Sequence, residues 1–232
     1  MNRVLAAARL QVVHPLVIFG VPWLVVGISF GLNVAIWALA DVARHDPNNF
    51  TGGVTALYIT VCVVFVQALT QLLPFAMGVS LSRRTYWLGT ALVGVLSALG
   101  YGIALAVLNE IGQATGGWGV DLNFWVPTPM LVDNFFLQIL VSGAPMLALI
   151  SIAIGIGVVY KRWGSNGLWT LTILSVLFFG GLAVLATGLN AWGDVWRWLT
   201  DQPTGTLAIG IPVAIAAVVA ALSYGGIRRV VP

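Results

Sequence analysis

Six long apolar stretches constrain this chain more than any other feature of its sequence. About 20 apolar residues in a helix are needed to cross about 30 Å of hydrocarbon. The stretches that meet this length are 16–39, 54–79, 87–108, 132–159, 168–189 and 207–226. With only 7% of its 232 residues charged, the chain cannot build a water-facing surface around so much apolar sequence. We therefore predict an all-α polytopic membrane protein with six transmembrane helices. It forms one transmembrane domain over 1–232, and residues 1–14 form a cytoplasmic lead-in helix.

The charged residues predict how these helices cross the membrane. Eight of the ten basic residues lie before the first stretch, in alternate connections or after the last stretch: Arg3, Arg9, Arg83, Arg84, Lys161, Arg162, Arg228 and Arg229. The seven acids fall in or beside the opposite loops: Asp41, Asp46, Glu110, Asp121, Asp133, Asp194 and Asp201. The positive-inside rule then places both ends of the chain in the cytoplasm.

Two loops on the predicted outer side are rich in tryptophan. Between the fifth and sixth stretches, Trp192 and Trp196 share one face of a helical wheel, and Asp194 takes the opposite face. This pattern predicts a short amphipathic helix at the outer interface. In the loop before the fourth stretch, Trp118, Phe124 and Trp125 are typical of an aromatic belt facing the lipid headgroups.

The inventory of reactive side chains argues against several functions. The sole lysine, Lys161, is followed by Arg162, so the chain lacks the Gly-Lys-Ser/Thr sequence of an ATP-binding P-loop. His14 and His45 lie at opposite ends of the first stretch, so they predict neither a metal site nor a histidine-activated serine. We predict no catalytic residue, no metal and no cofactor bound by this chain, and no nucleic-acid partner.

Uncharged polar side chains do occur at membrane depth. They are Asn33, Thr60, Gln67, Gln71 and Gln138. Thr60, Gln67 and Gln71 lie within about 40° of one another on a helical wheel. These groups fit hydrogen bonds between helices, worth about 0.6 kcal/mol each, or the polar lining of a translocation path. No stretch carries a charge near its centre, which disfavours an ion-coupled secondary transporter.

One stretch also predicts how helices pack. Gly94, Ala98 and Gly102 follow one another at intervals of four residues, which brings three small side chains onto one face of a helix. Such a ladder lets two helix backbones approach closely in a membrane.

The loop 78–89, Gly-Val-Ser-Leu-Ser-Arg-Arg-Thr-Tyr-Trp-Leu-Gly, resembles the first cytoplasmic loop of the type-2 permeases of ATP-binding-cassette (ABC) exporters. The segment 160–168 and the tail 227–229 are similar to the corresponding parts of that family. The resemblance extends over the chain, because length, six stretches, inward termini and short inner loops all agree with it. It implies the type-2 ABC exporter permease fold.

The resemblance also implies partners and a site. Members of the family dimerise and sit on two separate ATPase subunits, which hold ATP and Mg²⁺. Their first cytoplasmic loop forms a coupling helix that docks on the ATPase. Here that loop comprises Ser80, Ser82, Arg83, Arg84 and Tyr86. Either serine would cap the helix, the arginines would face the ATPase or lipid phosphates, and the tyrosine would anchor the exit. The positive-inside rule alone also accounts for the two arginines.

The implied function is the permease subunit of an exporter in the bacterial plasma membrane, which moves an amphiphilic drug, peptide or lipid outward. A non-transporting assembly or sensor subunit and, less favoured, an ion-coupled transporter are the alternatives. The substrate, the choice between homodimer and heterodimer, and a role in export or in self-immunity stay open.

Overall fold

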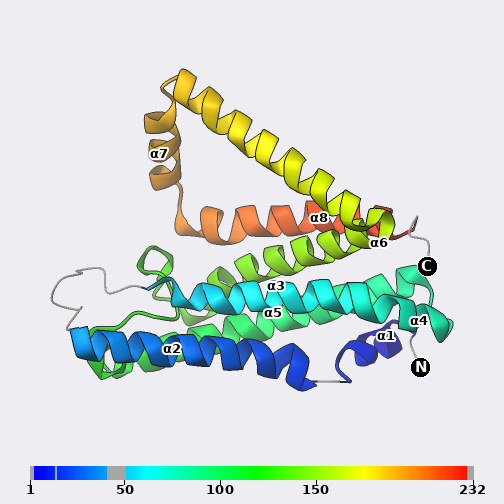
Figure 1. The fold of residues 1–232 in the computed structure, drawn as a ribbon. Coiled ribbons are helices and arrows are strands. Elements are labelled where there is room, and N and C mark those ends of the chain that lie inside the picture. The colour runs from blue at the N-terminus through cyan, green and yellow to red at the C-terminus, as the bar shows by residue number, and fades with distance from the viewer. Residues whose placement is uncertain (1–2, 14, 41–50, 229–232) are drawn as a thin grey trace.

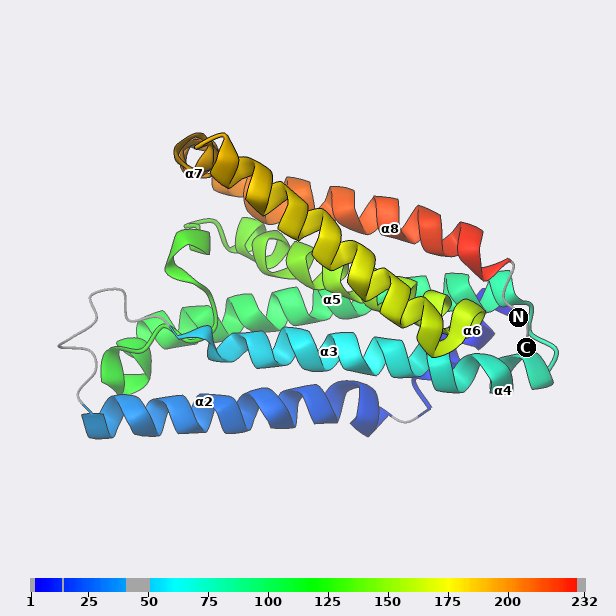
Figure 2. The same ribbon diagram turned by 45° about the horizontal axis from the view of Figure 1, so that its top comes forward.

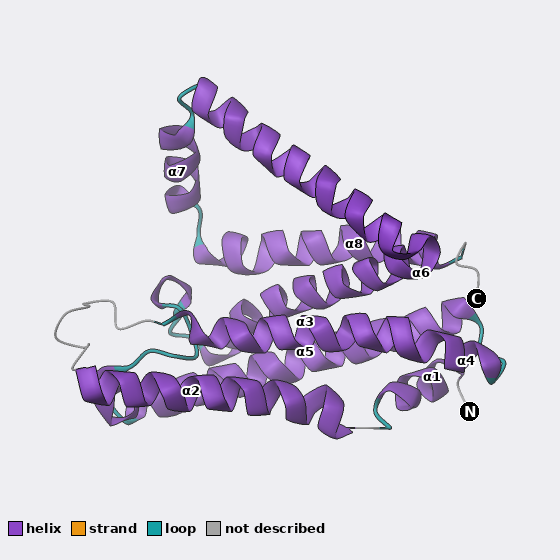
Figure 3. Cartoon of the chain, viewed as in Figure 1, coloured by secondary structure: helices purple, strands orange, loops and turns teal. Residues whose placement is uncertain are grey.

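The computed structural model describes residues 3–13, 15–40 and 51–228, and within these ranges the chain folds into helices joined by short loops (Figures 1 and 3). The helices are α1 (Arg3–Gln11), η1 (Leu16–Gly20), α2 (Val21–Ala40), η3 (Gly52–Val54), α3 (Thr55–Gln67), η4 (Ala68–Leu72), α4 (Leu73–Gly78), α5 (Arg83–Ala114), η5 (Gly117–Asp121), η6 (Thr128–Met130), α6 (Phe135–Gly188), α7 (Trp192–Asp201), η7 (Thr206–Gly210) and α8 (Ile211–Ile227). Several residues used in the sequence analysis lie outside the described ranges: Asp41, Asp46, His14, His45 and Arg229.

Five continuous helical segments are long and apolar enough to cross a membrane: Leu16–Ala40, Gly52–Gly78, Arg83–Ala114, Phe135–Gly188 and Thr206–Ile227. They cover nearly all of the six predicted stretches, because most of 132–159 and of 168–189 falls on α6. The chain is therefore an all-helical, multi-pass membrane protein, as predicted.

Helix α6 is not one straight rod. A straight helix of its 54 residues would be about 80 Å long, far beyond the roughly 30 Å of a bilayer core. At Gly164 the backbone leaves the helical region, with φ 65° and ψ −152°, a conformation that is essentially restricted to glycine. Figures 1 and 2 show α6 reversing its direction near this point.

The first half of α6 packs tightly against α5. A Cβ atom at Gly102 would lie 2.6 Å from the Ile139 carbonyl oxygen, and one at Gly143 would lie 3.0 Å from the Ala98 carbonyl oxygen. A Cβ at Gly94 would lie 2.8 Å from Ile150. The predicted close approach through the small-residue ladder is confirmed, and we call this contact the α5–α6 seam.

The second half of α6, residues 165–188, diverges from the bundle, and we call it the arm. Figures 1 and 2 show the arm leaving α8 at an angle, with α7 bridging their far ends. Its apolar side chains are exposed, as with Phe178 at 62% and Val184 at 72% of their surface. Added Cβ atoms at Gly180 and Gly181 would meet nothing within 4 Å.

Helix α7 forms where the amphipathic pattern predicts a helix, at Trp192–Asp201. All of its residues are exposed. On its polar face Arg197 and Asp194 form an ion pair, and Trp192 Nε1 donates a hydrogen bond to Thr187 Oγ1 at 3.0 Å. The prediction of an amphipathic helix here is confirmed.

The prediction of an aromatic belt is wrong for Phe124 and Trp125, whereas Trp118 is half-buried. Phe124 and Trp125 are buried, and Phe30 of α2 lies with its ring centroid about 5 Å from all three rings, at 5.0, 5.2 and 5.1 Å. The loop folds back over α2, with Trp118 and Phe124 packed edge to face against Phe30 and Trp125 tilted against it.

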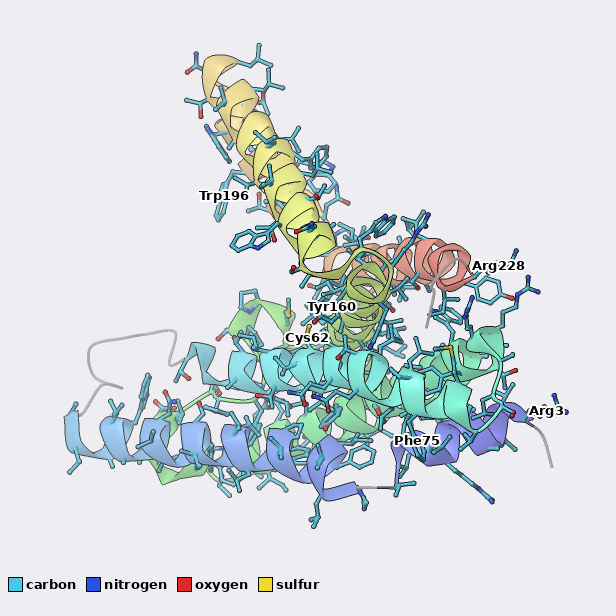
Figure 4. All side chains as sticks on the ribbon, turned by 45° about the vertical axis from the view of Figure 1, so that its right-hand side comes forward. Arg3, Cys62, Phe75, Tyr160, Trp196 and Arg228 are labelled. Atoms are coloured by element: carbon cyan, nitrogen blue, oxygen red, sulfur yellow. The ribbon has the colours of Figure 1, made fainter. Side chains whose placement is uncertain are left out.

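Charge divides the bundle into two ends. The α4–α5 turn, α1, the turn at Gly164 and the end of α8 lie together, and Figure 4 shows Arg3 and Arg228 extending from this same end. This basic end carries Arg3, Arg9, Arg83, Arg84, Lys161, Arg162 and Arg228. The opposite, acidic end carries all the described acids, Glu110, Asp121, Asp133, Asp194 and Asp201, together with Arg197.

Candidate functional site at the basic end

The turn between α4 and α5 is built by a defined helix-ending motif. The Leu81 N–H donates to the Ala76 carbonyl at 3.0 Å, and the Ser80 N–H donates to the Met77 carbonyl at 3.1 Å. Ser80 stands in the left-handed region with φ 63°. These two bonds form a Schellman motif, in which the left-handed position is usually glycine. A serine there holds a conformation that L-residues adopt at an energetic cost.

The turn ends where Ser82 begins α5. Its backbone is extended, and its Oγ accepts a hydrogen bond from the Thr85 N–H at 3.1 Å. This satisfies one of the free amides of the first helical turn, as an N-cap residue does. The resemblance implied that this loop forms a coupling helix capped by Ser80 or Ser82. In the structure Ser80 ends α4, Ser82 caps α5, and the segment between these helices is a turn.

Arg83 and Arg84 occupy the first two positions of α5, Arg83 half-buried and Arg84 exposed. Positive charge at a helix N-terminus opposes the helix dipole, by about 0.3–1 kcal/mol for each residue. All acids of the described chain lie at the acidic end, so none of them offsets these two charges. The turn therefore carries two cations that no acid of the described chain offsets.

The Tyr86 side chain stabilises this turn from the interior of the bundle. It is fully buried, and its hydroxyl donates to the Ala68 carbonyl at 2.7 Å. Ala68 opens the π-helical segment η4, which precedes Pro74. Such segments widen a helix where its regular hydrogen bonding is interrupted. Tyr86 therefore ties the first turn of α5 to this irregular segment rather than reaching a partner outside the bundle.

Helix α1 packs against the start of α5. Gln11 Nε2 donates to Thr90 Oγ1, and Thr90 Oγ1 in turn donates to the Tyr86 carbonyl at 3.0 Å. Ala7 is fully buried, and its Cβ would lie 2.8 Å from a Cβ added at Gly89. Sequence reasoning missed Gln11, although an amide inside an otherwise apolar segment is a signal of a buried hydrogen bond.

The structure brings together only some of the predicted pathway residues. Gln67 and Gln71 are exposed and line one groove with Gln11, of about 190 Å³, between α1–η1 and α3–η4. Thr60 and Asn33 are not part of it. Each donates to a carbonyl of its own helix four residues back, at 2.6 Å and 2.8 Å.

Gln138 is buried far from that groove, near the start of α6. Its Oε1 accepts from the Val132 N–H at 3.1 Å, and its Nε2 donates to Ser142 Oγ at 3.2 Å. Its amide is therefore satisfied by the packing of α6 and the preceding loop, which suits a structural role.

No protein-family model, no curated protein and no solved structure matches this chain. The class that the fold defines is a multi-pass helical membrane protein. Its candidate functional residues are those of the basic end.

Proposed function

We propose that this chain is the permease subunit of an ABC exporter in the bacterial plasma membrane. It dimerises with a second permease copy and works with a separate ATPase subunit that holds ATP and Mg²⁺. The observation that carries this proposal is the α4–α5 turn, which has a well-defined backbone and two uncompensated cations, Arg83 and Arg84. A turn of this kind suits docking to an acidic surface on a soluble partner.

The proposal includes a topology of six spans with both ends in the cytoplasm. The reversal of α6 at Gly164 supports counting its two halves as separate spans. The collection of seven basic residues at one end of the bundle supports placing that end inside.

In this proposal the turn transmits motion by direct connection. Closure of the ATPase pair moves Arg83 and Arg84, and Tyr86 passes this movement to η4 through its bond to Ala68. The π-helical segment before Pro74 is the natural place for α3 to bend, because its helical hydrogen bonds are already interrupted. Gln67 and Gln71 flank or lie on this segment, so bending changes the polar groove that they line.

The test is capture of the ATPase from native membranes with the tagged full-length chain. We expect a protein with a P-loop to co-purify with the wild type, and Arg83→Glu/Arg84→Glu to release it. Charge reversal at a complementary interface weakens binding by several kcal/mol, about 2–5 kcal/mol for a close pair. Arg228→Glu is the matched control, because it reverses a charge at the same end outside the turn.

Tyr86→Phe separates docking from coupling. It removes the bond to Ala68 without altering the exposed surface, so the ATPase should stay bound while substrate no longer stimulates its hydrolysis. Absence of any P-loop protein from the wild-type capture would favour the assembly or sensor subunit. Transport that continues without ATP but with an ion gradient would favour the secondary transporter.

A further inference from the structure

Two apolar grooves meet at the turn of α6. The first, of about 600 Å³, runs between α6 and α8, and its walls include Gly155, Val219 and Gly225. The second, of about 560 Å³, lies along the arm beside Leu174. Each volume falls in the range of ligand-binding pockets, about 300–1,000 Å³.

The two grooves share a ridge. Val159, Trp163 and Leu171 line both, so the Trp163 side chain stands between them. Gly167 makes this arrangement possible, because a Cβ there would lie 2.6 Å from the Trp163 Cβ. Two adjoining apolar channels separated by one aromatic side chain match the shape of a molecule with two hydrocarbon chains.

A cation lies beside the wall that the two grooves share. The Arg162 guanidinium lines the first groove and lies 4.2 Å from the centroid of the Trp163 ring. This cation–π contact holds the charge at the rim. Asn166 adds an exposed amide to the second groove. No acid of the described chain lies at this end, so the arginine is available to an external anion.

The two hydroxyl side chains that line the grooves already have hydrogen-bond partners. In the second groove, Thr170 Oγ1 donates to the Asn166 carbonyl at 2.9 Å. Ser223 lines the first groove, but its hydroxyl accepts a hydrogen bond from Trp87 Nε1 at 3.1 Å and donates to the Ala220 carbonyl at 3.0 Å. A charged rim above apolar channels favours an amphiphile over a peptide, whose backbone would lack hydrogen-bond partners there.

We infer that the turn of α6 is a binding site for one anionic diacyl phospholipid of the surrounding leaflet. Its two chains occupy the two grooves on either side of Trp163, and its phosphate pairs with Arg162, whose planar guanidinium suits bidentate contact with phosphate oxygens. The inference requires only that the chain is embedded in a bilayer, so it stands independently of the proposed ATPase partner.

Native mass spectrometry of the full-length protein with phosphatidylglycerol or phosphatidylcholine tests the site. We expect one phosphatidylglycerol to be retained about fivefold more strongly than phosphatidylcholine, as one interfacial arginine provides. Arg162→Gln should abolish this preference while phosphatidylcholine binding stays unchanged. Arg3→Gln, which removes a charge elsewhere at the basic end, should preserve the preference.

Gly225→Leu tests the groove itself. A Cβ at Gly225 meets nothing within 4 Å, so leucine should fold normally while it fills the first channel. We expect at least a fivefold loss of both lipids, whereas the control Gly180→Leu, in the open part of the arm, should bind as the wild type does. Unchanged phosphatidylglycerol retention in Arg162→Gln or Gly225→Leu would overturn the inference. So would a lipid-free dimer of the wild type that Gly225→Leu dissociates, because the groove would then hold a second copy.

Discussion

The two halves of α6 are both long apolar helices, yet one is packed into the bundle and the other is not. In the first half, a Cβ added at Gly143 would lie 3.0 Å from the Ala98 carbonyl oxygen of α5. In the arm, Gly180 and Gly181 face open space. Lipid is as apolar as a leucine side chain, so apolar content alone gives no driving force for packing. Close backbone approach at small residues provides it, and beyond Gly167 the glycines of the arm make no such approach within the described chain.

The largest expected effect comes from breaking the α5–α6 seam. Gly102→Leu would push a side chain into the Ile139 carbonyl, which is backbone and cannot rotate away. We expect the free energy of unfolding in detergent to fall by about 3 kcal/mol. Gly180→Leu should leave it unchanged or slightly raised, because leucine is the better helix former. A similar loss in both variants would mean that the arm is also packed.

Gln11 and Gln71 line the same groove between α1–η1 and α3–η4. Gln11 is buried and bonded to Thr90, whereas Gln71 is exposed. Gln11→Leu should lower the free energy of unfolding by about 1 kcal/mol, because it removes a buried hydrogen bond between α1 and α5. It should also expose α1 to limited proteolysis. Gln71→Leu should change neither the free energy of unfolding nor the proteolysis of α1. Equal behaviour of the two variants in thermal unfolding would show that α1 is not held by Gln11.

The smallest expected effects come from the two serines of the α4–α5 turn. Ser80→Gly should raise the free energy of unfolding by about 0.5 kcal/mol, because relief of the left-handed strain exceeds the added chain entropy of glycine. Ser82→Gly should change it in the opposite direction by a few tenths of a kcal/mol, because Ser82 is an extended N-cap. If thermal unfolding gave changes in the free energy of unfolding of the same sign for both variants, the left-handed backbone at Ser80 and the extended backbone at Ser82 would be contradicted.

The sequence predicted the features that depend on local pattern. Apolar length located the long helices, the spacing of Gly94, Ala98 and Gly102 located the seam, and the wheel around Trp196 located α7. Each of these patterns lies within one segment of sequence, so that segment is enough to recognise it.

The sequence could not predict which side chains face inward. Tyr86 was expected to anchor the exit of a cytoplasmic loop and is fully buried, and Trp125 was expected at the lipid interface and packs against Phe30 of α2. In water, polarity distinguishes an outside face from an inside face, but in lipid both faces are apolar. The left-handed backbone at Ser80 could not be predicted from the sequence either, because glycine is the residue that normally indicates such a position.

The most direct test of the account is which side of the membrane each end of the bundle faces. Single cysteines at Ser165, Gln113 and Gln202, in a Cys62→Ser background, would be treated with an impermeant maleimide on intact cells. Ser165 is exposed beside the turn of α6, and Gln113 lies in the last turn of α5 at the acidic end. We expect labelling at 113 and 202, and labelling at 165 only after the membrane is opened. Labelling at 165 in intact cells would contradict the orientation, and labelling at only one of 113 and 202 would contradict six spans.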